Sequence, residues 1–234
     1  MKKIIFKLIL CIMFGMVLTG CGDKINTDSP LYKAKENMIE NVDNYNMNIN
    51  ISVFTDFGDV SVKMDCKEDK VNQLSYCKSN SFGVGTESYV DYNNHYDYSK
   101  VYDEYGVTKS EWVKTKVPNV KNGQWLDLSN YIFDLQEKDD GSLENGLEYV
   151  GVIKLSKLLT MLEGFELPID ALKILNKDIT VDVILNQDNY IDSMNFDFEL
   201  VGIGMNVQIK FADYGTAGVI VIPEEVLNVK ESVN

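Results

Sequence analysis

The feature that most constrains the fold is an alternation of apolar and polar residues with a period of two, which begins at Met47. Residues 47–54 follow this pattern, and it returns after Gly58 in Val60, Val62 and Met64. Because a β-strand sends successive side chains to opposite faces, each stretch predicts a strand with one buried face. Further strands are predicted at 71–78, 82–92, 95–102, 111–117, 179–185, 190–200, 205–211 and 219–222. The short polar turns between them predict an antiparallel sheet.

Other stretches place apolar residues three or four positions apart, which is the spacing of a helix face. Residues 29–45 show this pattern, with Ser29 as a cap and Pro30 in the first turn. A second helix is predicted from Asp127 to Leu135, a third over 154–163 and a short one over 169–175. Strands in two runs, with helices grouped in two places, predict an α+β fold.

The charged residues exclude several classes of function. The chain has 22 lysines, no arginine and 36 acidic residues, and its formal net charge is −14. Such a chain repels phosphate backbones, so no nucleic-acid partner is expected. The single histidine, His95, follows the Asn93-Asn94 turn, and no nucleophile motif accompanies it. The acidic clusters match no calcium loop. We therefore expect neither a catalytic site nor a metal site.

The N-terminus has the zones of an export signal. A lysine-rich start precedes an apolar run that is too short for a comfortable membrane-spanning helix. The following Leu18-Thr19-Gly20-Cys21 resembles the lipobox of bacterial lipoproteins. This resemblance implies that residues 1–20 are a lipoprotein signal peptide and that Cys21 carries a covalent diacylglycerol, the one prosthetic group expected. An ordinary signal peptide, or an N-terminal anchor with an incidental cysteine, is the alternative.

Residues 21–29 are small and polar, which predicts a flexible lipidated tether. Removal of residues 1–20 takes away three lysines, so the net charge becomes −17. This charge should hold the folded body clear of an anionic membrane. The predicted location is the extracytoplasmic face of the cell membrane, with the lipid as the anchor.

Two cysteines remain in the predicted mature chain, Cys66 and Cys77. They flank residues 67–70, a polar turn candidate, so they are expected on facing strands. An even pair in an oxidising compartment predicts a disulfide. Two unpaired structural thiols are the alternative.

The order of these features resembles that of LolA/LolB/LppX-like lipoproteins, including uncharacterised members from low-GC Gram-positive bacteria. The likeness is strongest in residues 207–215 and 221–223 and in the tract from Tyr89 to Tyr98, and it extends over most of residues 29–229. It implies a single LolA-like domain over residues 30–234. That domain would be a strongly curved antiparallel half-barrel, with helices covering its concave face. Some members carry acyl chains or lipoproteins in the resulting cavity.

Four residues are candidates for lining such a cavity: Tyr96, Tyr98, Leu158 and Leu162. Tyrosine offers apolar area with a polar tip, and the leucines form a stripe on one predicted helix. Ordinary strand surface for the tyrosines, and helix packing for the leucines, are the alternatives. The predicted function is a non-enzymatic binder or carrier of a hydrophobic ligand, such as a lipid or acyl chain. The alternative is an envelope adaptor or sensory lipoprotein that binds a protein partner.

Overall fold

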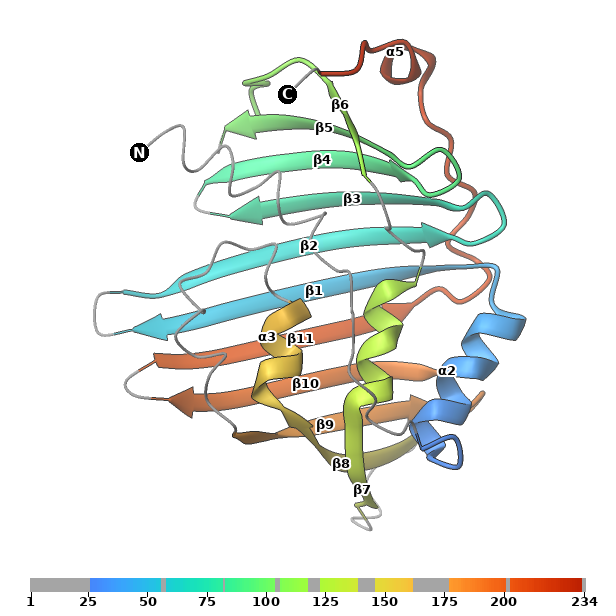
Figure 1. Cartoon of the computed structure of the whole chain (residues 1–234), viewed down its shortest axis with the longest axis vertical. Helices are drawn as coiled ribbons and strands as arrows, with labels where there is room; N and C mark the ends of the chain where they lie inside the picture. Colours follow the sequence, from blue (N-terminus) through green and yellow to red (C-terminus); the bar gives the residue numbers. More distant parts are fainter. Residues whose placement is uncertain are drawn as a thin grey trace.

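The computed structural model describes residues 26–55, 58–81, 83–103, 106–117, 123–138, 146–161, 177–200 and 203–232. Its main element is one antiparallel sheet of 11 strands (Figure 1). The strands are β1 (Asn44–Thr55), β2 (Val60–Asp69), β3 (Leu74–Ser81), β4 (Val84–Asp91), β5 (Tyr96–Asp103), β6 (Val113–Lys116), β7 (Ile132–Glu137), β8 (Gly146–Lys154), β9 (Asp178–Asn186), β10 (Ile191–Leu200) and β11 (Ile203–Ala212). The helices are α2 (Pro30–Asn41), the 3₁₀ helix η1 (Gln124–Tyr131), α3 (Leu155–Met161) and α5 (Glu224–Leu227).

The strand order is β6-β5-β4-β3-β2-β1-β11-β10-β9-β8-β7, so the sheet is open, with β6 and β7 at its edges. The first and last long strands meet in the middle, where Met47 of β1 lies opposite Cys66 of β2 and Phe211 of β11. All neighbouring pairs are antiparallel. The predicted antiparallel sheet is therefore confirmed.

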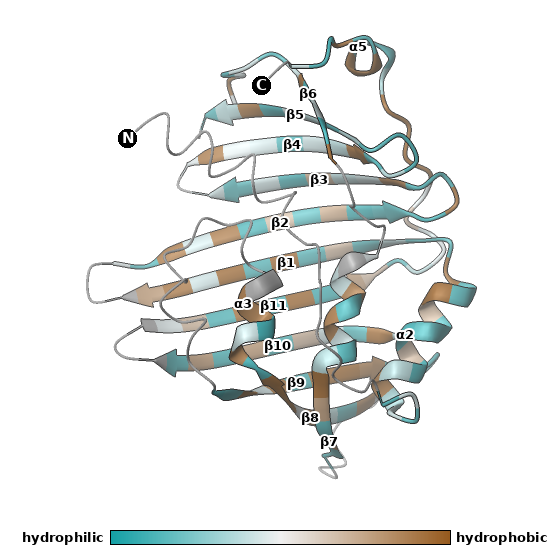
Figure 2. Cartoon of the chain, viewed as in Figure 1, coloured by the Kyte–Doolittle hydropathy of each residue, from teal (hydrophilic) through white to brown (hydrophobic). Residues whose placement is uncertain are grey.

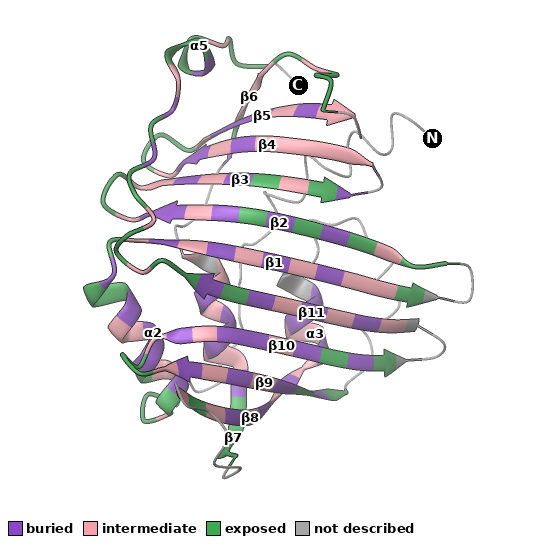
Figure 3. Ribbon diagram, turned by 180° about the vertical axis from the view of Figure 1, so that it is seen from behind, coloured by how far each residue is buried: buried purple, intermediate pink, exposed green. Residues whose placement is uncertain are grey.

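Helices α2 and α3, together with η1, lie against one face of the sheet, which we call the inner face (Figure 1). The other side is the outer face. The alternation in the sequence decides which side chains reach the inner face, because Met47, Ile49 and Ile51 point to it and are buried. Viewed from behind, buried and less buried residues alternate along β1, β10 and β11 (Figure 3). Burial of this apolar area is the main stabilising contribution to the fold.

The predicted helix from Asp127 to Leu135 is wrong beyond Tyr131. There η1 ends, and the chain continues as strand β7, in which Ile132 pairs with Ile153 of β8. Strand β8 itself was not predicted. Val150 and Val152 place apolar side chains on its outer face, so the sequence shows no clear alternation there.

The predicted strand over 219–222 is also wrong. These residues have no regular secondary structure and pair with no strand of the described sheet. Instead, the Ile220 amide donates a hydrogen bond to Asp69 Oδ2 at 2.9 Å. Residues 219–232, which we call the C-terminal strap, then run to α5 beside β5 and β6 (Figure 1).

The remaining helix predictions differ in their outcome. Helix α3 lies within the predicted 154–163, and α2 occupies the first part of the predicted 29–45. The predicted helix over 169–175, like the signal peptide and most of the tether, lies outside the described residues. Among the residues that are described, no helix is long and apolar enough to cross a membrane.

Candidate functional site

The inner face changes character from one half of the sheet to the other. Beneath the helices, along β1 and β8–β11, it carries large apolar side chains, and β8 and β9 show brown stretches there (Figure 2). Along β3–β5 it carries Val84, Val90 and Val101 together with a set of small hydroxyl side chains. The hydroxyl side chains are Ser75, Ser79 and Ser81 of β3, Thr86 and Ser88 of β4, and Ser99 of β5.

The helix-covered half is filled with side chains. Leu155, Leu158 and Leu159 of α3 are fully buried in the same core cluster as Ile153 of β8. The candidate cavity residue Leu158 is therefore part of a packed core. Leu162, the other leucine proposed for the cavity, lies outside the described residues.

A row of polar side chains crosses the inner face from β2 to β5. Glu68 lies opposite Ser75 of β3, Ser75 lies opposite Val90 of β4, and Val90 lies opposite Asp97 of β5. Glu68 and Asp97 are therefore three strand spacings apart, or about 14 Å along the sheet. Tyr45 of β1 continues the row, since it lies opposite Glu68.

Tyr92, in the turn after β4, connects the members of this row. Its hydroxyl donates a hydrogen bond to Ser75 Oγ at 3.1 Å. The same hydroxyl is hydrogen-bonded to Glu68, and the charge of Asp97 helps to raise the pKa of Tyr92. We call Tyr45, Glu68, Ser75, Tyr92 and Asp97 the polar row.

The polar row holds two carboxyl groups away from water. Glu68 is 5% exposed and Asp97 is 1% exposed. Burial raises the pKa of Glu68 to about 8, although the hydrogen bond from Tyr92 opposes the shift. Burial likewise raises the pKa of Asp97 to about 8, with the Ser99 hydroxyl opposing it. Both groups therefore prefer their neutral form near neutral pH.

Several buried oxygen atoms of this region have no hydrogen-bond partner among the described residues. They are Tyr45 Oη, Glu68 Oε2, both carboxyl oxygens of Asp97, Ser81 Oγ and Ser99 Oγ. Leaving one buried polar group unsatisfied costs about 1–3 kcal/mol. Such a concentration is unusual in a folded chain, where nearly all buried polar atoms are paired.

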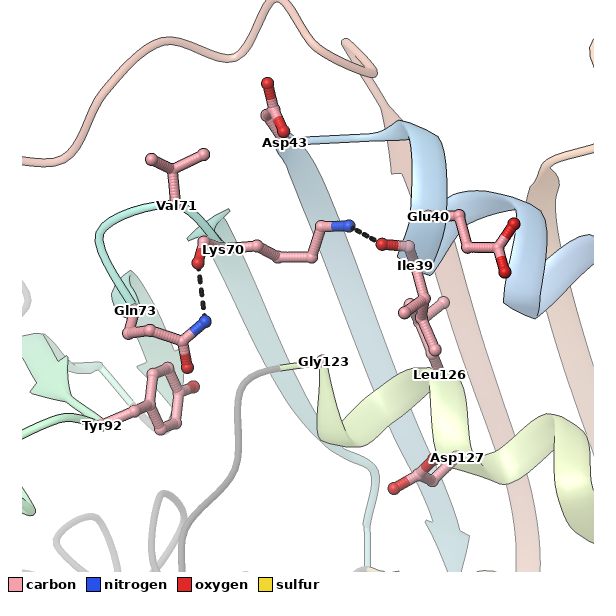
Figure 4. Close-up of a pocket in the computed structure, with 10 residues that line it drawn as sticks. All are labelled: Ile39, Glu40, Asp43, Lys70, Val71, Gln73, Tyr92, Gly123, Leu126 and Asp127. Carbon is pink, nitrogen blue, oxygen red and sulfur yellow. Dashed lines mark hydrogen bonds between the residues drawn. The ribbon is translucent and has the colours of Figure 1, made fainter.

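A pocket of about 570 Å³ opens at the end of the sheet next to this row (Figure 4). It is lined by Ile39, Glu40, Asp43, Lys70, Val71, Gln73, Tyr92, Gly123, Leu126 and Asp127. Lys70 fixes one wall, since its Nζ donates to the carbonyl oxygens of Met38 at 2.9 Å and Ile39 at 2.6 Å. Burial lowers the pKa of Lys70, and the charge of Asp43 opposes that shift.

Tyr92 and Gly123 separate this pocket from the polar row. Tyr92 lines the pocket, and its hydroxyl belongs to the row. Gly123 has a φ of +74°, and a Cβ atom built on it would lie 3.8 Å from Tyr45 Oη. Tyr92 and Gly123 therefore border both the pocket and the polar row.

The other two proposed cavity residues, Tyr96 and Tyr98, do not belong to this region. They alternate with Asp97 along β5, so they lie on the outer face, away from Leu158. Tyr98 packs there with Ile222 and Val226 of the C-terminal strap. The expectation that the tyrosines line a cavity with the leucines is corrected by this geometry, since the four residues do not form one site.

The predicted pair Cys66 and Cys77 is joined by a disulfide on the inner face. The turn between them lies at residues 70–73 and not at 67–70, because β2 continues to Asp69. Cys21, the predicted lipid attachment site, lies outside the described residues. His95 occupies an exposed turn position, as predicted.

Sequence reasoning did not find the polar row. A signal was present, since Glu68 continues the inward series Val62, Met64 and Cys66. Asp97, between two tyrosines, takes the inward position on β5 in the same way. An acidic residue at a position whose neighbours in the alternation are buried is the pattern that would have located both carboxyl groups.

The comparisons with known proteins concern the fold. No family model and no curated protein sequence matches this chain. The lipoprotein LppX of Mycobacterium tuberculosis aligns with 82% of this chain and 96% of its own, at 12% identity and a TM-score of 0.51. A domain named as an outer membrane lipoprotein-sorting protein, from Vibrio parahaemolyticus, aligns over 87% and 97%, at 7% identity and a TM-score of 0.26. On the likeness to LppX, the described residues, with their open sheet of 11 antiparallel strands, have an LppX-like fold.

Proposed function

We propose that this protein is a lipid-anchored, extracytoplasmic binder or carrier of a ligand with an apolar part. The observation that carries the proposal is the inner face of the open sheet, where a helix-covered apolar half adjoins a half that carries small hydroxyl side chains. Ser75, Ser81 and Ser88 are only 2–3% exposed, so this half of the face is screened from solvent, as a site for an apolar group requires. We further propose that α2, η1 and α3 cover the concave side of a half-barrel, as in the lipoproteins that the sequence resembles.

The anchor is part of this proposal. Cys21 would carry the diacylglycerol, and the folded body begins within ten residues of it, at α2. Cells grown with an alkyne-tagged fatty acid should incorporate the tag into the wild-type chain. A Cys21→Ser chain should lose the tag, because the thiol that carries the lipid is absent. Retention of the tag in that variant would contradict the assignment of Cys21.

No catalysis is proposed. His95 lies in an exposed turn, and the described part of the chain contains no group of three or more metal-binding side chains. The buried carboxyl groups of the polar row are here given a binding role.

Ligand binding is tested on protein taken from its own cells. Native mass spectrometry of the exported Cys21→Ser chain, purified without detergent, should find additional mass that organic extraction removes. Lipid analysis of the extract identifies the ligand. A chain that carries no such mass and binds no amphiphile in titrations would overturn the proposal, and it would direct attention to the alternative of an envelope adaptor.

A further inference from the structure

We propose that the polar row is a headgroup site and that it takes an amphiphile bearing an ammonium group. This inference rests on the proposed function and names the chemistry of its ligand. Its basis is geometric: Glu68 and Asp97 lie on the inner face, and each is nine-tenths or more buried. Because three strand spacings separate them, each would pair with its own ammonium group. Glu68 Oε2 has no hydrogen-bond partner among the described residues, and Asp97 has only the neighbouring Ser99 hydroxyl acting on it.

The unpaired atoms of the row can all accept a hydrogen bond. Carboxylate oxygens accept only, and hydroxyl oxygens accept readily. No described lysine points its amino group into the row, and the nearest one in the pocket, Lys70, is bound to the end of α2. While Glu68 and Asp97 are neutral they also carry O–H donors, so a ligand donor is needed only where a carboxyl group has given up its proton. An ammonium group supplies three donors together with the opposite charge, and the rings of Tyr45 and Tyr92 can add cation–π contacts.

The adjoining pocket offers a route for a cation. Three of its lining residues are acidic, namely Glu40, Asp43 and Asp127, against Lys70. Asp127 is paired with Lys35 at 3.7 Å, so Glu40 and Asp43 supply the excess of negative charge. An opening with this balance attracts positive charge and repels anions. Tyr92 lines the pocket and its hydroxyl also interacts with Glu68, so a group that passes this side chain reaches the row.

The protonation of Glu68 should differ between the polar row without a ligand and the polar row with a bound ammonium group. Without a cation, Glu68 holds its proton near neutral pH, because it is buried beside Tyr45, Tyr92 and Asp97, with Asp127 of η1 also acting on Tyr45. None of these neighbours supplies a positive charge. A bound ammonium group does, so the carboxyl group gives up its proton to solvent and an ion pair forms. Binding of an amine should therefore release protons, and binding of an alcohol should not.

The test compares decylamine with 1-decanol, which share an alkyl chain and differ in the charged head. Isothermal titration of the exported Cys21→Ser chain, which retains every described residue, should give at least tenfold tighter binding of the amine at pH 7. Repeating the titration in phosphate and in Tris, whose heats of ionisation differ, should reveal proton release with the amine only.

Variants then locate the effect. A chain with Glu68→Gln and Asp97→Asn keeps the shape of the neutral carboxyl groups, and it should bind both compounds equally. Asp197→Asn makes the same chemical change on the outer face of β10, and it should keep the preference for the amine. Equal affinities in the unsubstituted row, or a preference that survives the double substitution, would overturn the headgroup site while leaving a hydrophobic binder in place. Failure of both compounds to bind would overturn both proposals.

Discussion

Cys66 of β2 lies directly opposite Cys77 of β3, and a disulfide joins the two strands at the border between the two halves of the inner face. The bond closes a loop of sequence separation 11 around the 70–73 turn. Replacing both residues with alanine should lower the free energy of unfolding by about 3 kcal/mol, since a short closed loop restricts the unfolded chain.

Urea denaturation measures this loss. The control is the wild-type chain with a reductant, which breaks the same bond without changing the packing volume and should lose a similar amount. A double variant as stable as the oxidised wild type would show that the bond contributes nothing to the folded state.

The buried carboxyl groups predict how stability depends on pH. The pKa of Glu68 is raised from 4.5 to about 8 in the folded chain. Between these two values the folded chain holds a proton that the unfolded chain releases, so the free energy of unfolding should fall as the pH rises. One such group contributes about 1.4 kcal/mol for each pH unit in this window.

Glu68→Gln should reduce that dependence, because the amide resembles the protonated acid and cannot ionise. Urea midpoints of the variant and the wild type at pH 5, 6, 7 and 8 measure the difference, which should be largest at pH 8 and in favour of the variant. Asp197→Asn, on the outer face, should follow the wild-type curve. Parallel curves for Glu68→Gln and wild type would contradict the burial of Glu68 in its neutral form.

The C-terminal strap is held on the outer face by Val226, which is fully buried in contact with the Tyr98 cluster. Val226→Asp would bury a charge, so the strap should detach and limited proteolysis should cut within residues 219–232. Its neighbour Leu227 is 46% exposed, and Leu227→Asp should leave the strap protected. Equal cleavage of the two variants would mean that the outer tyrosines do not hold the strap.

The sequence predicts those parts of the structure that depend on residues close together in the chain. Met47, Ile49 and Ile51 predict both a strand and its buried face, because polar residues that face the other way stand between them in the sequence. The row of Glu68 and Asp97 is different, since it exists only once β2 to β5 are aligned in register. Tyr98 shows the same limit, since its packing depends on Val226, more than a hundred residues later. The alternation around Tyr98 predicts a strand, but it does not predict which segment covers each face of that strand.

Gly151 of β8 is a position where the fold allows little change, because β7 approaches it closely. A Cβ atom added there would lie 2.6 Å from Ile132 Cγ2 and 3.3 Å from the carbonyl oxygen of Phe133. Gly151→Ala should therefore displace β7 and lower the free energy of unfolding by about 1–3 kcal/mol. Gly85→Ala is the matched control, since its nearest neighbour would be at an ordinary 3.6 Å, and the variant should be neutral or slightly more stable. Chemical denaturation of both variants measures the difference. Because β7 is an edge strand, its amide hydrogens should also exchange faster in Gly151→Ala and not in Gly85→Ala. Unchanged exchange in both would mean that β7 does not depend on the missing side chain at position 151.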